Sequence, residues 1–252
     1  MFEIISDSST RIKTALVLLA AILVIGFVDS FFLTWAVLGG LMLFALYEAM
    51  NLFNIEDDSI YFYGAVIWIV AYVYPKPEDL VFILAIIFAS VLAYTKEFNK
   101  NLFMPLFYPI GSFLFILSLY SSFGMESLLW LLVVVAGADV GAYYVGKTLG
   151  STPFCATSPK KTLEGVFGGV VTAAILGVTF SLDQFSFWSA LIISAVVAVT
   201  SVFGDLFESY LKREADVKDS GDILPGHGGI LDRTDGYLFG AVVMLVLLRL
   251  FS

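Results

Sequence analysis

The chain has 252 residues, of which 60% are hydrophobic and only 14% are charged, and its mean hydropathy is +0.94. Soluble domains carry roughly 25% charged residues, so this composition excludes an ordinary soluble protein and indicates an integral membrane protein. The formal net charge of −9 says little about topology, because acidic residues barely influence it. A single cysteine, Cys155, excludes an intrachain disulfide.

Apolar segments along the chain predict an all-α, polytopic integral membrane protein with about nine transmembrane helices. A bilayer core of about 30 Å requires roughly 17 to 25 apolar residues from each spanning helix. The segments cover residues 12–28, 31–50, 60–74, 80–94, 106–123, 127–147, 166–182, 188–210 and 235–251. The third and fourth are short, as expected of tilted hairpin arms or re-entrant helices, so the count could differ by one.

The distribution of lysine and arginine predicts the orientation in the membrane. With the N-terminus inside, all of the 13 basic residues except Lys76 and Arg249 fall on the cytoplasmic side. We therefore expect a multi-pass protein of the cell inner membrane with its N-terminus inside, its C-terminus outside and its charged loops in the cytoplasm.

Chemically informative residues are concentrated in the second half of the chain. We expect one integral membrane unit, residues 1–252, in which helices within 1–124 form a scaffold and residues 125–252 form the catalytic half, with cytoplasmic loops at 148–165 and 213–234. Glu48 is a rare acid in the first half. It could line the active cavity, but we favour a side chain that extends to the membrane interface.

Asp139 lies about 12 residues into its apolar segment, roughly 18 Å along a helix and well inside the bilayer. A charged side chain at that depth costs about 2.5 to 3.5 kcal/mol and usually marks a functional site. Gly137 and Gly141 flank it and favour a close helix contact, in which Asp139 would be a buried hydrogen-bonding residue instead. Both interpretations stay open on these residues alone.

The polar segment TSPKKTLEG at 157–165 combines two adjacent lysines with hydroxyl residues, a proline and a glycine. Adjacent lysines at a membrane edge are typical of positive-inside signals or of attraction to lipid headgroups. Here hydroxyl and amide donors alternate with the charges, which favours the binding of a phosphate chain. The candidate residues are Ser158, Lys160, Lys161 and Thr162.

The stretch from Phe203 to Gly236 concentrates charge in an otherwise apolar chain. Polar side chains from Asp205 to Lys212 recur at three- and four-residue spacing, which places them on one face of a helix. After Val217, glycines and a proline exclude regular helix and allow the backbone to approach a ligand. Charged residues at 232–235 open the last apolar segment, where free amides and the positive helix end favour bound anions.

A spaced signature in this stretch resembles that of the phosphatidate cytidylyltransferases, also called CDP-diacylglycerol synthases. It consists of Ser209, Leu211, Lys212, Arg213, Lys218, Asp219, Gly221, Leu224, Pro225, His227, Gly228, Gly229, Ile230, Asp232, Arg233 and Asp235. Residues 139–147 and 157–165 resemble two further motifs of the family, with Leu163 where many members carry tryptophan. The resemblance extends over about residues 137–240 and favours a site role for Asp139.

This resemblance implies a membrane nucleotidyltransferase that condenses CTP with phosphatidic acid to CDP-diacylglycerol and pyrophosphate, the first committed nucleotide step of phospholipid synthesis. Both substrates are anions, so cationic groups and a metal ion must relieve their repulsion. Mg²⁺ prefers carboxylate oxygens together with substrate phosphates. The resemblance further implies a homodimer and, in some members, a second cation such as K⁺. We expect the lipid bilayer as the other partner, and no nucleic acid.

These requirements assign roles to the candidate residues. We expect Asp205 and Asp232 to be the Mg²⁺ ligands, with Asp235 and Asp219 as second choices, whereas Asp222 would cap the loop. The catalytic residues would be Asp205, Asp232, Lys212, Arg233 and Asp139. The phosphates of CTP and lipid would contact Ser158, Lys160, Lys161, Thr162, Lys212, Arg213, Lys218, His227, Gly228, Gly229 and Arg233.

His227 is the only histidine of the chain. The attacking phosphate monoester is already largely ionised at pH 7, because its second pKa is near 6, so the reaction needs no strong general base. We therefore expect His227 to donate a hydrogen bond to phosphate or to order the loop, with general-base catalysis as the alternative.

The alternatives to this function are a transporter, an enzyme that consumes CDP-diacylglycerol and a polyprenol kinase. An anion or ion-coupled transporter would suit Asp139, but the sequence shows no internal repeat of the kind common in transporters. An enzyme that consumes CDP-diacylglycerol would need an Ala-Arg pair after its D-x-x-D-G motif, whereas Tyr237 and Leu238 follow Gly236. A CTP-dependent polyprenol kinase would be distinguished by its product.

Overall fold

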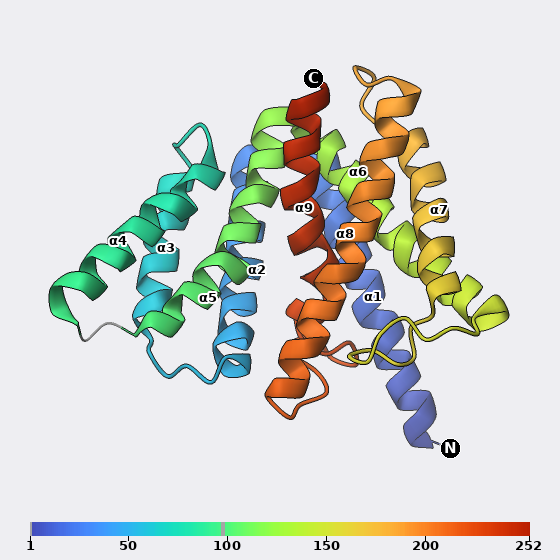
Figure 1. The fold of residues 1–252 in the computed structure, drawn as a ribbon, viewed down its shortest axis with the longest axis horizontal. Coiled ribbons are helices and arrows are strands. Elements are labelled where there is room, and N and C mark those ends of the chain that lie inside the picture. Colours follow the sequence, from blue (N-terminus) through green and yellow to red (C-terminus); the bar gives the residue numbers. More distant parts are fainter. Residues whose placement is uncertain (1, 97–98) are drawn as a thin grey trace. The chain divides into compact units, whose positions relative to one another are not determined.

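The computed structural model describes residues 2–96 and 99–252, and within these ranges the chain is helical and contains no β-strand (Figure 1). The all-α prediction is therefore confirmed. The elements are α1 (Phe2–Val28), α2 (Phe31–Leu52), α3 (Ser59–Ala71), η1 (Pro77–Asp79), α4 (Leu80–Thr95), η2 (Lys100–Leu102), α5 (Phe103–Pro105), η3 (Leu106–Gly111), α6 (Ser112–Leu149), α7 (Leu163–Thr179), α8 (Phe187–Glu214) and α9 (Leu231–Phe251).

Six helical segments in the described residues are long and apolar enough to cross a membrane, which indicates a multi-pass membrane protein. The predicted count of nine is not confirmed. The apolar helices α3 and α7 have only 13 and 17 residues. The predicted spans 106–123 and 127–147 both fall within the helical stretch Lys100–Leu149, in which two helices meet at a kink at Gly124.

Gly124 marks the kink at which two helices of that stretch meet. Gly124 has φ 75° and ψ −177°, a backbone conformation that glycine adopts without a side-chain clash. The Ser127 hydroxyl lies 2.7 Å from the Gly124 carbonyl and 3.0 Å from the Leu119 carbonyl, so it can donate to a backbone oxygen at the break. The break therefore falls between the two predicted spans.

The chain divides into two compact units. The first consists of Met1–Leu117 and Leu211–Arg233, and within it α2, α3, α4 and η3 pack on one another. Trp35 and Trp68 each donate an indole N–H to the other's carbonyl oxygen, at 2.8 and 3.1 Å. Trp68 is buried, and it packs on Gly39, where a Cβ would clash with the Trp68 Nε1.

The second unit consists of Ser118–Tyr210 and Thr234–Ser252. Small residues bring its helices into close contact, as in many membrane helix pairs. A Cβ at Gly141 of α6 would meet Thr172 of α7, and a Cβ at Gly177 of α7 would meet Ser194 of α8. Ser194 also accepts a buried hydrogen bond of 3.0 Å from the Trp130 indole. The close helix contact predicted from the glycines of α6 is confirmed, but the burial of Asp139 expected with it is not, since Asp139 is exposed.

Candidate active site

The loop between α8 and α9, residues 215–230, lies in the first unit and contains a tight turn from Leu224 to Gly228. The Leu224 amide donates to the Gly228 carbonyl at 2.9 Å, and the His227 amide donates to the Leu224 carbonyl at 2.8 Å. Gly226 and Gly228 have φ values of 75° and 83°, which residues with a side chain rarely adopt. The prediction that α8 ends and gives way to a glycine-shaped loop is confirmed.

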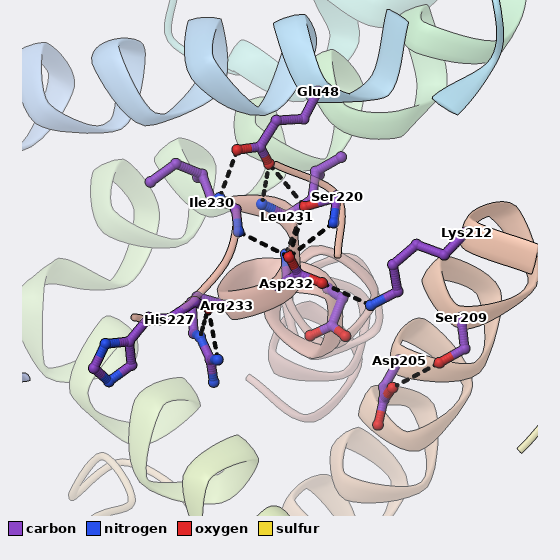
Figure 2. A network of polar contacts seen from close by, with 12 residues as sticks. Glu48, Asp205, Ser209, Lys212, Ser220, His227, Ile230, Leu231, Asp232 and Arg233 are labelled. Atoms are coloured by element: carbon purple, nitrogen blue, oxygen red, sulfur yellow. Dashed lines mark hydrogen bonds and ion pairs between the residues drawn. The ribbon is translucent and has the colours of Figure 1, made fainter. Parts of the chain in front are cut away.

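Asp232, in the first turn of α9, is the centre of this loop's hydrogen-bond network (Figure 2). Its Oδ1 accepts from the Lys212 ammonium at 2.6 Å. Its Oδ2 accepts from the Ser220 amide at 2.9 Å, the Ser220 hydroxyl at 3.0 Å and the Gly229 amide at 2.8 Å. The side chains of Lys212 and Asp232 are only 14% and 8% exposed, so little solvent screens the pair.

Arg233 contacts the same loop through a backbone oxygen. Its Nε and Nη2 both donate to the His227 carbonyl, at 2.9 and 2.7 Å, while the side chain remains exposed. One carbonyl therefore orients the guanidinium, whose other N–H groups are directed elsewhere. His227 orders the loop through its main chain, and a contact between its imidazole and phosphate stays a prediction.

Glu48 of α2 is a member of the network, a role near the site that the sequence interpretation considered but did not favour. Its side chain is completely buried and accepts from the amides of Ile230 and Leu231, at 2.9 and 2.8 Å. The expectation that Glu48 extends to the membrane interface is wrong. The expectation of free amides at the start of α9 is also wrong at these two positions, because this carboxylate already occupies the positive helix end.

The second unit contains another lysine–aspartate pair. Lys161 forms an ion pair with Asp205 Oδ2, and the Ser209 hydroxyl lies 3.3 Å from Asp205 Oδ1 (Figure 2 shows the latter contact). The Lys161 backbone is held by the amide of Phe154, which donates to its carbonyl at 2.8 Å, and by the Ser158 carbonyl, which accepts from its amide at 3.0 Å. The loop and α8 thus place a cation beside a carboxylate.

Glu164 holds the other end of that loop. Its carboxylate accepts from the amide and hydroxyl of Ser151, at 3.1 and 2.9 Å, and from those of Thr152, at 3.2 and 2.8 Å. Hydrogen bonds from its own amide and from the Thr152 side chain lower the pKa of Glu164 to about 2. Thr162 caps α7 by accepting from the Gly165 amide at 3.1 Å.

The structure thus distributes the predicted site residues over the two units. The first unit contains Lys212, Arg213, Lys218, Asp219, His227, Gly228, Gly229, Asp232 and Arg233, and the second contains Asp139, Ser158, Lys160, Lys161, Thr162, Asp205 and Asp235. Of these, six are exposed, namely Asp139, Lys160, Arg213, Lys218, Asp219 and Arg233. Asp235 accepts a hydrogen bond of 2.7 Å from the Gly236 amide.

The donor chemistry suits a hard cation, although the described residues contain no group of three His, Cys, Asp or Glu side chains that could hold a metal alone. Mg²⁺ is usually bound by one or two carboxylates together with waters and substrate phosphates. Asp205 and Asp232 each present carboxylate oxygens beside a lysine. Taken separately, each carboxylate would need waters and a substrate phosphate to complete the coordination of a metal.

These features define a multi-pass membrane protein that presents two lysine–aspartate pairs on ordered loops and helix ends. Residues 9–251 match the model of the cytidylyltransferase family. The chain is 45% identical to a phosphatidate cytidylyltransferase of Helicobacter pylori strain J99, over 98% of this chain and 94% of the relative. It is 33% identical to the enzyme of that name from Thermotoga maritima, over 97% of each chain.

A third relative matches over about half of each chain. The phosphatidate cytidylyltransferase of Bacillus subtilis strain 168 is 46% identical over 134 residues, which are 52% of this chain and 50% of the relative. The chain therefore belongs to the cytidylyltransferase family, and the resemblance seen in the signature of residues 209–235 is confirmed.

Proposed function

We propose that this chain transfers the cytidylyl group of CTP to phosphatidic acid. A phosphate oxygen of the lipid attacks the α-phosphorus of CTP, the bond from that phosphorus to the β-phosphate oxygen breaks, and pyrophosphate leaves. The products are CDP-diacylglycerol and pyrophosphate. The observation that carries the proposal is full-length similarity to enzymes named phosphatidate cytidylyltransferase, with the signature residues held around the Lys212–Asp232 pair.

The first unit supplies a phosphate-binding loop. Lys212 is a cation whose counter-charge, Asp232, is fixed by three further donors, and Arg233 is oriented by the His227 carbonyl. Lysine provides a point charge and arginine a planar fork, and both stabilise phosphate oxygens. This part of the chain would bind phosphate groups and offset the charge that accumulates as pyrophosphate leaves.

The second unit supplies a similar pair, Lys161 with Asp205, at the end of a loop rich in hydroxyl groups. We assign Lys161, Lys160 and Ser158 to phosphate binding. We assign Asp205 and Asp232 as carboxylates that would hold Mg²⁺, which when bound would offset negative charge on the substrate phosphates. Active-site loops facing the cytoplasm, a homodimer and a second cation such as K⁺ complete the proposal.

Product formation tests the proposal directly. The purified protein in detergent micelles receives phosphatidic acid, CTP labelled in its cytosine ring and Mg²⁺, and lipid-soluble label is measured. We expect CDP-diacylglycerol from the parent and none after addition of EDTA. The matched substitution Asp58→Asn, in an exposed loop, should retain activity, whereas Asp205→Asn and Asp232→Asn should not.

A parent that produced no lipid-soluble cytidine label would contradict the proposal. If the same preparation instead phosphorylated a polyprenol in the presence of CTP, the chain would be a kinase within the same membrane class. Label in the cytosine ring separates the two reactions, because a kinase transfers the γ-phosphate and leaves the cytidine in water.

A further inference from the structure

Glu48 is a buried carboxylate far from the signature in sequence. It belongs to α2, and its hydrogen-bond partners Ser220, Ile230 and Leu231 lie 172 to 183 residues later in the chain. A buried carboxylate is costly unless hydrogen-bonded donors surround it. Here backbone amides at the start of α9 and one hydroxyl supply those donors, so Glu48 caps a helix on which the site depends.

Ser220 connects Glu48 with Asp232. Its hydroxyl oxygen lies 3.0 Å from Glu48 Oε2 and 3.0 Å from Asp232 Oδ2. The oxygen also accepts from the Asp232 amide at 3.3 Å. A serine hydroxyl carries one proton, so it donates to one of the two carboxylates at a time. The position of that proton therefore depends on both acids, and a change at Glu48 reaches Asp232 through a single side chain.

The loop closes tightly around the Glu48 carboxylate. A Cβ at Gly221 would lie 2.7 Å from Glu48 Oε1, and a Cβ at Gly229 would lie 2.5 Å from Glu48 Oε2. Both glycines belong to the signature. A side chain at either position would clash with Glu48, so the loop can approach this carboxylate only with glycine at both positions.

We propose that Glu48 is a positioning residue of the active site, which acts through Ser220 to orient Asp232 and to hold the loop of residues 215–230 in its reactive arrangement. Glu48 itself touches no substrate. The proposal rests on the proposed function for its kinetic part, while its structural part, the ordering of the loop by Glu48, can be tested without any substrate.

The substitution Glu48→Gln keeps the shape of the side chain and removes one of its two acceptor oxygens. An amide NH₂ cannot accept from a backbone N–H or from a hydroxyl proton, so at least one of the three donors loses its partner. We expect kcat to fall roughly ten- to hundredfold, with a smaller change in the KM for CTP. Hydrogen exchange should become faster in the loop of residues 215–230 and stay unchanged in the part of α8 before Ser209.

Two control variants carry the same chemical change elsewhere. Glu56→Gln alters an exposed acid in the loop after α2, and Glu78→Gln alters a second buried acid, in η1. Both should leave kcat and loop exchange near the parent values. A loss of kcat in Glu78→Gln as large as in Glu48→Gln would overturn the proposal, because any buried glutamate would then have the same effect.

Ser220→Ala tests the route. If Glu48 acts through the Ser220 hydroxyl, Ser220→Ala should also lower kcat, and the double variant should fall no further than the worse single variant. Fully additive losses would overturn the proposal, as would parental kcat and parental exchange in Glu48→Gln. Should Glu48→Gln fail to fold, kcat and loop exchange in Ser220→Ala decide the matter.

The two proposals fail in distinguishable ways. A parent without cytidylyltransferase activity contradicts the proposed function, and loop exchange in Glu48→Gln, compared with Glu78→Gln, then decides the positioning role by itself. If the parent is active and hydrogen exchange of the loop is unchanged in Glu48→Gln, the positioning role is contradicted and the proposed function stands.

Discussion

Asp205 and Asp232 are predicted to be equally necessary for activity but very unequal for stability. The test is the pair of substitutions Asp205→Asn and Asp232→Asn, each of which removes one negative charge and preserves side-chain volume. On the proposed function both carboxylates are needed for the reaction, so both variants lose it. What separates them is the number and burial of the hydrogen bonds that each carboxylate accepts.

The structure gives the expected size of the difference. Asp232 accepts four hydrogen bonds and is 8% exposed, and an asparagine there can direct its one carbonyl oxygen either to the loop donors or to Lys212. The cost should be about 2 to 4 kcal/mol, as for breaking a largely buried charged pair. Asp205 is 33% exposed and Lys161 is 27% exposed, so solvent screening limits the loss there to less than about 1 kcal/mol.

The assay is thermal unfolding of the purified variants in detergent, next to cytidylyltransferase activity. One kcal/mol corresponds to roughly 2 to 4 °C in a protein of this size, so Asp232→Asn should lower the apparent Tm by roughly 5 to 15 °C and Asp205→Asn by less than about 4 °C. Equal shifts in Tm for the two variants, or an unchanged Tm in Asp232→Asn, would refute the reasoning.

Three further predictions follow from individual contacts. The pKa of Glu164 is lowered, so its hydrogen bonds stabilise the loop fully above the unfolded pKa of about 4.3 and are lost as the pH falls toward 2. Proteolysis of this loop in the parent should therefore increase as the pH falls over that range. Glu164→Gln should be cleaved similarly at both ends of the range. Gly229→Ala places a methyl group against Ser220 and Glu48 and should reduce folded yield, whereas Gly40→Ala, with open space at its Cβ, should match the parent in fluorescence size-exclusion profiles. Ser194→Ala leaves the buried Trp130 indole without its acceptor and should cost about 1 to 3 kcal/mol in thermal unfolding, with activity per folded molecule retained.

Local chemistry explains what could be predicted from the sequence. Glycines and a proline after Val217 exclude helix, so the end of α8 and the loop before α9 follow from the residues themselves. Apolar segment lengths give the helices, and Gly124 falls in the interval between the predicted spans 106–123 and 127–147. The count of nine is not confirmed, because α3 and α7 have only 13 and 17 residues and the two spans on either side of the Gly124 kink are joined without a loop.

Long-range pairing explains what could not be predicted. Glu48 occurs near the end of an apolar helix, where an acid can also extend to the interface, and no neighbouring residue marks it as buried. Its partners Ile230 and Leu231 lie 182 and 183 residues away. The pairing of Lys161 with Asp205 likewise depends on how a loop packs against α8, which no periodic pattern encodes.

The two lysine–aspartate pairs suggest how each lysine is kept ready for an anionic substrate. The carboxylate balances the positive charge of the lysine in the absence of substrate. When substrate arrives, the ammonium can exchange the carboxylate for a phosphate oxygen, because both are anionic acceptors. The Asp232 carboxylate would stay in place during that exchange, since two backbone amides and the hydroxyl that Ser220 shares with Glu48 hold its Oδ2. Asp205 has only Ser209 besides Lys161 in the contacts described above, so its carboxylate should be the more mobile of the two.

This asymmetry predicts different responses to loss of each lysine. Lys212→Met should impair turnover while Asp232 keeps its position, so kcat falls and loop exchange changes little. Lys161→Met should also release Asp205, so we expect faster hydrogen exchange in the loop of residues 151–164 together with an increased KM for CTP. Kinetics and exchange measured on both variants decide the point: equal exchange changes in the two loops would show that the three Oδ2 donors do not anchor Asp232, and the partner-exchange argument would then fail.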